Sequence, residues 1–169
     1  GRAVGAPGVV PMLKQAHQAH GKLPWAKTFE YAIALADNGF EVSPRLNKLL
    51  TDDAFLRKDP TAFALYYNAD GSPKAVGVRL QNPALAKTIR AIAAAGPSAM
   101  QTGDIAQSII SAMLARGAKA DEILNLADLA DYVAKQRDPV CAPYRIWRLC
   151  SMGPPSSGGI TVLQILAHL

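Results

Sequence analysis

Two adjacent serines stand between paired prolines and paired glycines in the run 152–159, which reads Met-Gly-Pro-Pro-Ser-Ser-Gly-Gly. Hydroxyls just before a helix could act as nucleophiles, or could join the free N–H groups of the helix in binding an anion. Prolines stiffen such a run, and glycines allow another chain or a ligand to approach closely. We therefore take Ser156, Ser157, Gly158 and Gly159 as the candidate substrate-contact residues.

A catalytic serine needs a general base within hydrogen-bond reach, and the sequence does not supply one. The run does not match the G-x-S-x-G pattern of a nucleophile elbow, and the chain contains no S-x-x-K. It has three histidines, of which His168 lies at the far end of the helix predicted after the loop. Loop shaping, capping or packing beside a substrate is therefore the favoured role for Ser156 and Ser157.

Metal and carboxylate chemistry find little support elsewhere in the chain. His17 and His20 lie at i, i+3 on a predicted helix and could supply two zinc ligands, but no third or fourth ligand is evident. The acidic pairs 52–53 and 121–122 consist of sequence neighbours, which point in different directions on a helix and do not form the paired acids of a glycosidase. Glycine-rich phosphate-binding loops are absent from the sequence. We expect no metal and no cofactor.

Hydrophobic periodicity and helix caps predict a mainly helical chain that ends in a β-hairpin and one more helix. The predicted helices cover 9–20, 25–38, 44–51, 82–95, 103–116 and 126–135. Prolines that follow Ser43 and Asn82 mark two of the helix starts, and Thr102 is the expected cap of another. Residues 53–67 are irregular, and a turn cluster follows at 68–73.

The hairpin is predicted over Val140–Met152, interrupted at Ala142-Pro143, and the last helix over Ile160–His168. A turn near Tyr144 would not place Cys141 directly opposite Cys150, so a disulfide and two free thiols both remain open.

Composition sets the remaining limits. The 169 residues are 50% apolar and 18% charged, which fits one folded domain or one piece of a larger protein. The net charge is +5, but the basic residues are scattered, so no nucleic-acid surface is indicated. No apolar run is long enough for a membrane span, and no signal peptide is evident. Val162, Ile165, Leu166 and Leu169 form an apolar stripe without a cap, which suggests a missing partner.

Many short motifs resemble the γ-glutamyltranspeptidase family, in order and at fitting intervals along nearly the whole chain. They are Gly5–Val10, Ala16-His17, Gly21–Trp25, Ala32–Ala36, Gly39–Ser43, Leu85–Ile89, Gly96-Pro97, Thr102–Ala106, Tyr144-Arg145 and Pro154–Gly159. Departures from the family pattern occur at Val78, Met100-Gln101, Ile146 and Gly153, and they indicate a divergent member.

The resemblance implies an N-terminal-nucleophile hydrolase with an αββα sandwich, made as a precursor that cleaves itself into a large and a small subunit. The new N-terminal threonine of the small subunit would attack a γ-glutamyl amide and pass the acyl group to water or to an amine. Residues 1–169 match the middle of the large subunit, with 1–136 mainly helical and 137–169 containing the hairpin, loop and last helix. No catalytic residue is therefore expected within this chain.

The implied partners are the rest of the large subunit, the small subunit and a small-molecule γ-glutamyl substrate of glutathione type. The implied location is periplasmic or extracellular. We expect the chain alone to be inactive and to self-associate through uncovered apolar surface. Two alternatives remain open: a related acylase acting on glutaryl-cephalosporins or poly-γ-glutamate, and a non-catalytic helical interaction domain.

Overall fold

The computed structural model describes residues 4–169 and divides into two compact units. The first unit ends at Val133, and the second is Ala134–Leu169. Helices dominate the first unit, and the second holds a hairpin and one helix, which confirms the predicted α+β, predominantly helical class. Within the described residues, no helix combines the length and the apolar character needed to cross a membrane.

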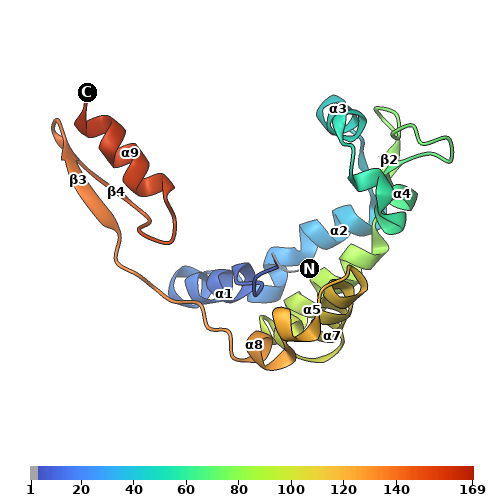
Figure 1. The fold of residues 1–169 in the computed structure, drawn as a ribbon, viewed down its shortest axis with the longest axis horizontal. Coiled ribbons are helices and arrows are strands. Elements are labelled where there is room, and N and C mark those ends of the chain that lie inside the picture. Colours follow the sequence, from blue (N-terminus) through green and yellow to red (C-terminus); the bar gives the residue numbers. More distant parts are fainter. Residues whose placement is uncertain (1–3) are drawn as a thin grey trace. The chain divides into compact units, whose positions relative to one another are not determined.

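The first unit is built from short helices joined by turns and by longer loops, such as the one between α4 and β2 (Figure 1). Its α-helices are α1 (Val9–His20), α2 (Glu30–Asn38), α3 (Pro44–Asp52), α4 (Pro60–Tyr66), α5 (Pro83–Ala95), α6 (Ser98–Gln101), α7 (Gly103–Ala115) and α8 (Leu126–Ala130). Three 3₁₀ turns are η1 (Trp25–Phe29), η2 (Leu56–Lys58) and η3 (Ala120–Glu122). Strands β1 (Phe40–Glu41) and β2 (Arg79–Leu80) pair antiparallel, with Phe40 opposite Leu80.

Cap-plus-proline pairs start three of these helices. Ser43 and Asn82 each accept a hydrogen bond from the backbone N–H three residues on, at 3.1 and 2.9 Å, and a proline follows each cap. The same signal at Asp59-Pro60 begins α4, a helix that the sequence analysis missed by treating 53–67 as irregular. The Asp59 carboxylate accepts from the N–H of Ala62 at 2.9 Å. A polar side chain followed by proline therefore starts three helices, although Ser72-Pro73 and Asp138-Pro139 show that the same pair also occurs outside helices.

Three of the predicted helical features differ in the structure, and two of them involve tertiary contacts. The helix predicted over 25–38 begins as the 3₁₀ turn η1, where the Trp25 indole donates to the carbonyl of Ile92 at 3.1 Å. The helix predicted over 126–135 ends at Ala130, and the Tyr132 carbonyl beyond it accepts from Gln101 at 2.7 Å. Thr102 is the N-cap residue of α7, as predicted, but its side chain makes no capping hydrogen bond, and its hydroxyl donates instead to the Ser98 carbonyl at 3.1 Å.

The core of the first unit is small and rich in alanine. Ala86 on α5 and Ala106 on α7 are completely buried, and α2 packs against α5. Larger buried side chains include Val42, Leu80 and Leu129. Small residues let helix backbones approach closely, so this unit packs with little bulk between its helices.

The second unit is an antiparallel hairpin with one helix packed on it (Figure 1). Strand β3 (Val140–Tyr144) pairs with β4 (Trp147–Ser151), and α9 (Gly158–Ala167) contacts both strands. The turn is Arg145-Ile146, so the predicted interruption at Ala142-Pro143 was wrong, because both residues lie within β3. Pro143 lies opposite Arg148. Because the two-residue turn makes this a non-hydrogen-bonded pair, no backbone N–H is needed at residue 143, and the strand tolerates a proline there.

The position of the turn also settles the state of the two cysteines. With Arg145-Ile146 at the tip, Cys141 lies directly opposite Cys150 in the strand register. Their Cα atoms are 4.1 Å apart, and a disulfide joins them. The bonded alternative is therefore the correct one.

Candidate functional site

The candidate loop runs from Met152 to Ser157 and joins β4 to α9. The N–H of Ser156 donates to the carbonyl of Gly153 at 3.2 Å, which closes a turn around two prolines joined by a cis peptide bond. The carbonyl of Ser157 accepts from both the N–H and the hydroxyl of Thr161, at 3.0 and 2.9 Å. The loop is thus fixed by its own backbone and by the first turn of α9.

The glycines at the start of α9 have different surroundings. A Cβ on Gly159 would collide with the carbonyl oxygen of Met152 and would lie 2.8 Å from the Ser151 hydroxyl. A Cβ on Gly158 would meet nothing closer than the Ser156 hydroxyl at 4.0 Å. At Gly153, the added atom would lie 3.2 Å from a methyl group of Val140. Gly159 is therefore the residue that lets α9 begin against the end of β4.

The two serine hydroxyls are not arranged as nucleophiles. Ser156 is half-buried, Ser157 is exposed, and the Ser157 side chain makes no capping hydrogen bond. His168 follows the ten-residue helix α9, which places it about 15 Å along the axis from Ser157. Across residues 4–169, neither hydroxyl is hydrogen-bonded to a general base, so the serine chemistry considered from the sequence has no support in the geometry.

Of the two candidate metal ligands, His17 is used for packing and His20 is exposed. His17 places its Nε2 atom 2.8 Å from the carbonyl oxygen of Leu23, and its ring meets the Trp25 indole edge-on at 5.3 Å. Lys14 lies over the same indole, 4.7 Å from its centre. The described part of the chain holds no cluster of three or more histidine, cysteine or acidic side chains able to bind a metal.

The acidic pairs serve helix ends. Asp52 forms an ion pair with Lys48 at 2.8 Å, and this hydrogen bond raises the pKa of Lys48 above its usual value. Asp53 accepts from the N–H groups of Leu56 and Phe55, and these bonds lower the pKa of the carboxyl. Glu122 lies 3.8 Å from Lys119. These carboxylates cap and pair, so they offer no general acid and base.

One groove was not predicted from the sequence. It has a volume of about 710 Å³ and lies between α5 and α7, where five alanines, Ile105 and Ile109 line it together with the charged side chains of Lys87 and Asp104. Its two hydroxyl side chains, Thr88 and Ser108, donate to carbonyls of their own helices at 3.2 and 2.7 Å. The run of alanines in α5 was the available sequence signal. The groove is therefore largely apolar, with one lysine and one carboxylate in its lining.

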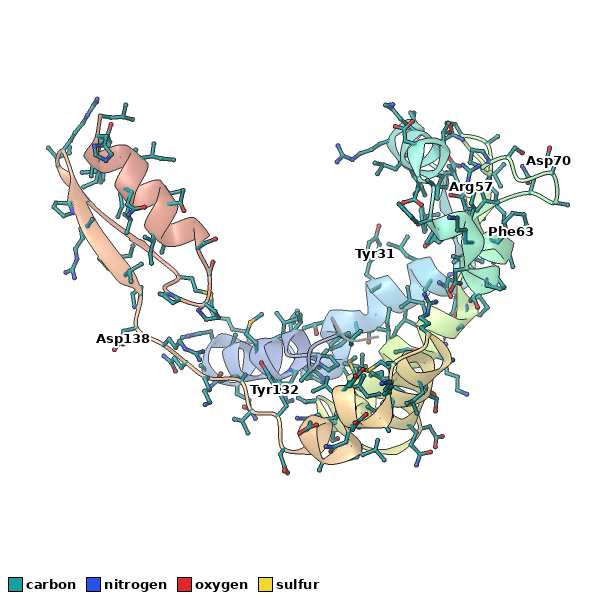
Figure 2. All side chains as sticks on the ribbon, in the orientation of Figure 1. Tyr31, Arg57, Phe63, Asp70, Tyr132 and Asp138 are labelled. Carbon is teal, nitrogen blue, oxygen red and sulfur yellow. A yellow bond between two sulfur atoms is a disulfide. The ribbon has the colours of Figure 1, made fainter. Side chains whose placement is uncertain are left out.

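Two features at the surface of the first unit are an exposed tyrosine on α2 and an acidic turn between α4 and β2. Tyr31 projects from α2 into solvent and is 77% exposed, and Asp70 marks the outlying turn between α4 and β2 (Figure 2). The Asp70 carboxylate accepts from the hydroxyl and the N–H of Ser72, and both bonds lower the pKa of Asp70. That acid therefore shapes its own turn.

The geometry defines a mainly helical α+β segment with one shaped strand-to-helix loop and, within residues 4–169, no complete catalytic set. The family model described as Gamma-glutamyltranspeptidase matches residues 1–169. The chain therefore belongs to the γ-glutamyltranspeptidase family, as the motif order predicted.

Known relatives agree with this assignment. The Acylase ACY 1 proenzyme of Pseudomonas sp. (strain SE83) is 35% identical over 98% of this chain, which spans 29% of that protein. The Glutathione hydrolase proenzyme of Escherichia coli (strain K12) is 35% identical over 97% of this chain, which spans 28% of it. The crystal structure of Helicobacter pylori gamma-glutamyltranspeptidase superposes with a TM-score of 0.88 at 30% identity, covering 97% of this chain and 46% of that one.

Proposed function

We propose that this chain is part of the large subunit of an enzyme that hydrolyses or transfers γ-glutamyl groups from glutathione-type substrates. The observation that carries the proposal is the family match over residues 1–169. Relatives named glutathione hydrolase proenzyme give further support at 35% identity. In this proposal, the nucleophile is the N-terminal threonine of a small subunit, which lies outside these residues.

The proposed role of the Pro-Pro-Ser-Ser-Gly-Gly loop is to shape the scaffold beside the substrate. Ser156, Ser157, Gly158 and Gly159 remain the candidates for substrate contact. The close approach of Gly159 to Met152 and the lack of a base bonded to either hydroxyl favour positioning over attack. The proposed partners are the remaining large subunit and the threonine-bearing small subunit, and relatives named as proenzymes support this processing.

A periplasmic or extracellular location is proposed as well. The disulfide between Cys141 and Cys150 supports it, because such bonds persist in oxidising compartments and are rare in the cytosol.

An acylase is the second candidate, because the Acylase ACY 1 proenzyme matches the chain at 35% identity, as closely as the glutathione hydrolases do. The two candidates differ in the donor, which is a γ-glutamyl amide for one and a glutaryl-cephalosporin for the other.

The test compares the two donors on the full-length, processed protein. We expect a γ-glutamyl anilide to be turned over with the larger kcat/KM. A larger kcat/KM for the glutaryl-cephalosporin would overturn the first candidate in favour of the second. A full-length protein that is never cleaved and acts on neither donor would support the helical interaction domain instead.

A further inference from the structure

We propose that the disulfide between Cys141 and Cys150 is a redox-sensitive clip that holds the Pro-Pro-Ser-Ser loop in shape. The neighbour of each cysteine contacts a glycine of the loop region. Val140, beside Cys141, lies against Gly153, where an added Cβ would sit 3.2 Å from its methyl group. Ser151, beside Cys150, lies against Gly159. The disulfide therefore joins the two residues that directly neighbour, in sequence, the side chains of Val140 and Ser151 that contact these glycines.

The clip acts on a hairpin with little other support. Within residues 4–169, its two strands have only each other as sheet neighbours, and a two-stranded hairpin needs a further element packed on it, which here is the single helix α9. The tight turn holds one end at Arg145-Ile146, while the cysteines lie near the other end, where the strands would otherwise fray. The whole unit is Ala134–Leu169. Domains shorter than about 40 residues usually need a disulfide, a metal or a partner in order to fold, and this unit is shorter than that.

The bond is open to attack from solvent. Ser151 faces α9, so strand alternation places Cys150 on the opposite face of the hairpin, where it is exposed. Cys141 is half-buried on the same face. A small-molecule thiol can therefore reach the Cys150 sulfur without first displacing α9.

The exchange uses two molecules of a small thiol, such as glutathione. The first thiolate attacks the Cys150 sulfur, and Cys141 leaves as a thiolate that takes up a proton. The second thiol attacks the mixed disulfide and releases Cys150 as a thiol. The protein gains two electrons and two protons, and the two small thiols become one small disulfide. The strand ends can then separate, so that Val140 and Ser151 no longer fix the loop.

The test is hydrogen exchange, measured by mass spectrometry, on the 169-residue chain before and after reduction. We expect exchange across residues 152–167 to speed up roughly 10- to 100-fold on reduction, since the bond closes a short loop in the unfolded state. Exchange in α5, which belongs to the first unit, should stay unchanged and serves as the internal reference. Intact mass should show the two-hydrogen gain on reduction.

The double variant Cys141→Ser, Cys150→Ser is the matched control. These are the only two cysteines in the sequence, so this variant should give the fast pattern with or without reductant. Unchanged exchange in 152–167 after full reduction would overturn the proposal. Two free thiols in the untreated chain under air would overturn it also. An equal rise of the exchange rate in α5 would overturn it as well, because the effect of reduction would then not be local.

Discussion

Gly158 and Gly159 are adjacent in the sequence, yet only one of them is required by its surroundings. Gly159 lies against the Met152 carbonyl and the Ser151 side chain, whereas Gly158 has open space around it. The sequence pattern alone identified both as candidates, because two glycines before a helix look alike. The difference depends on how α9 packs on β4, which is a tertiary fact.

We expect Gly159→Ala to destabilise the second unit by about 1–3 kcal/mol, because the new methyl group overlaps backbone that must shift. Gly158→Ala should be neutral or slightly stabilising, since alanine favours the helix more than glycine does. Hydrogen exchange across α9 would measure both. Equal effects of the two substitutions would contradict the packing described for this loop.

Ser157→Ala in the full-length protein should leave activity measurable. Its hydroxyl makes no capping bond, and the carbonyl that holds Thr161 belongs to the backbone and is kept. Turnover of a γ-glutamyl anilide by the variant is the appropriate measurement. Complete loss of turnover in a variant that folds and is processed normally would assign Ser157 a catalytic role.

Asp59 should make the start of α4 sensitive to acid. The hydrogen bond from the Ala62 N–H, followed by the ion pair with Arg116, holds the pKa of Asp59 below its ordinary value of 3.8. A lowered folded-state pKa means that the stabilisation is fully present above 3.8 and is lost as the pH falls through the lower folded value.

The protection of the Ala62 amide should therefore stay constant from neutral pH to about 4 and decline below it. The Asp59→Asn variant keeps a hydrogen-bond acceptor at the cap but has no carboxyl group to titrate. The protection of the Ala62 amide in this variant should therefore vary much less over the same pH range. Amide exchange of Ala62 against pH gives the comparison. An identical acid decline in Asp59→Asn would show that another group controls this helix.

At the level of elements, local signals predicted some boundaries closely and missed others. The predicted helix 9–20 is α1, and the starts of α3 and α5 follow their caps. Two failures occurred where a distant partner decides the local structure, whereas α4 was missed although its start at Asp59-Pro60 is a local signal. Gln101 binds the Tyr132 carbonyl beyond α8, and the Trp25 indole reaches Ile92. Hairpin register depends on a turn of two residues. Neither Arg145 nor Ile146 is a typical turn residue, so the sequence analysis placed the turn near Tyr144, with an interruption at Ala142-Pro143.

Helix α9 has one apolar side on the hairpin and another in solvent. Val162, Ile165 and Leu169 are 52%, 55% and 82% exposed, while Leu163 and Leu166 are half-buried. The stripe predicted from the sequence is therefore largely uncovered in this chain. We propose that the remaining subunit covers it in the complete enzyme.

The isolated chain should self-associate through this surface, so light scattering should show a mass that rises with concentration. Val162→Lys together with Ile165→Lys should reduce the association, because both side chains are exposed and contribute little packing. Gln164→Lys adds charge to the same helix at a polar position, and as the control it should reduce association less. A clean monomer over a wide concentration range would contradict the prediction.

At the scale of the whole molecule, family membership was readable because many weak motifs keep one order along the chain. Few active-site residues could be predicted from the same sequence, because its polar side chains serve the local structure. His17 packs against Trp25, Asp53 binds the backbone N–H groups that follow it, and Ser156 and Ser157 have no hydrogen-bonded base within residues 4–169. A scaffold role is therefore the interpretation that fits both the chemistry and the family.

The most direct test of this account is the hydrolysis of a γ-glutamyl anilide by the 169-residue chain and, in parallel, by the processed full-length protein. The account predicts turnover by the full-length protein and none by the chain alone, because the proposed nucleophile is a threonine outside these residues. Turnover by the 169-residue chain itself would contradict it.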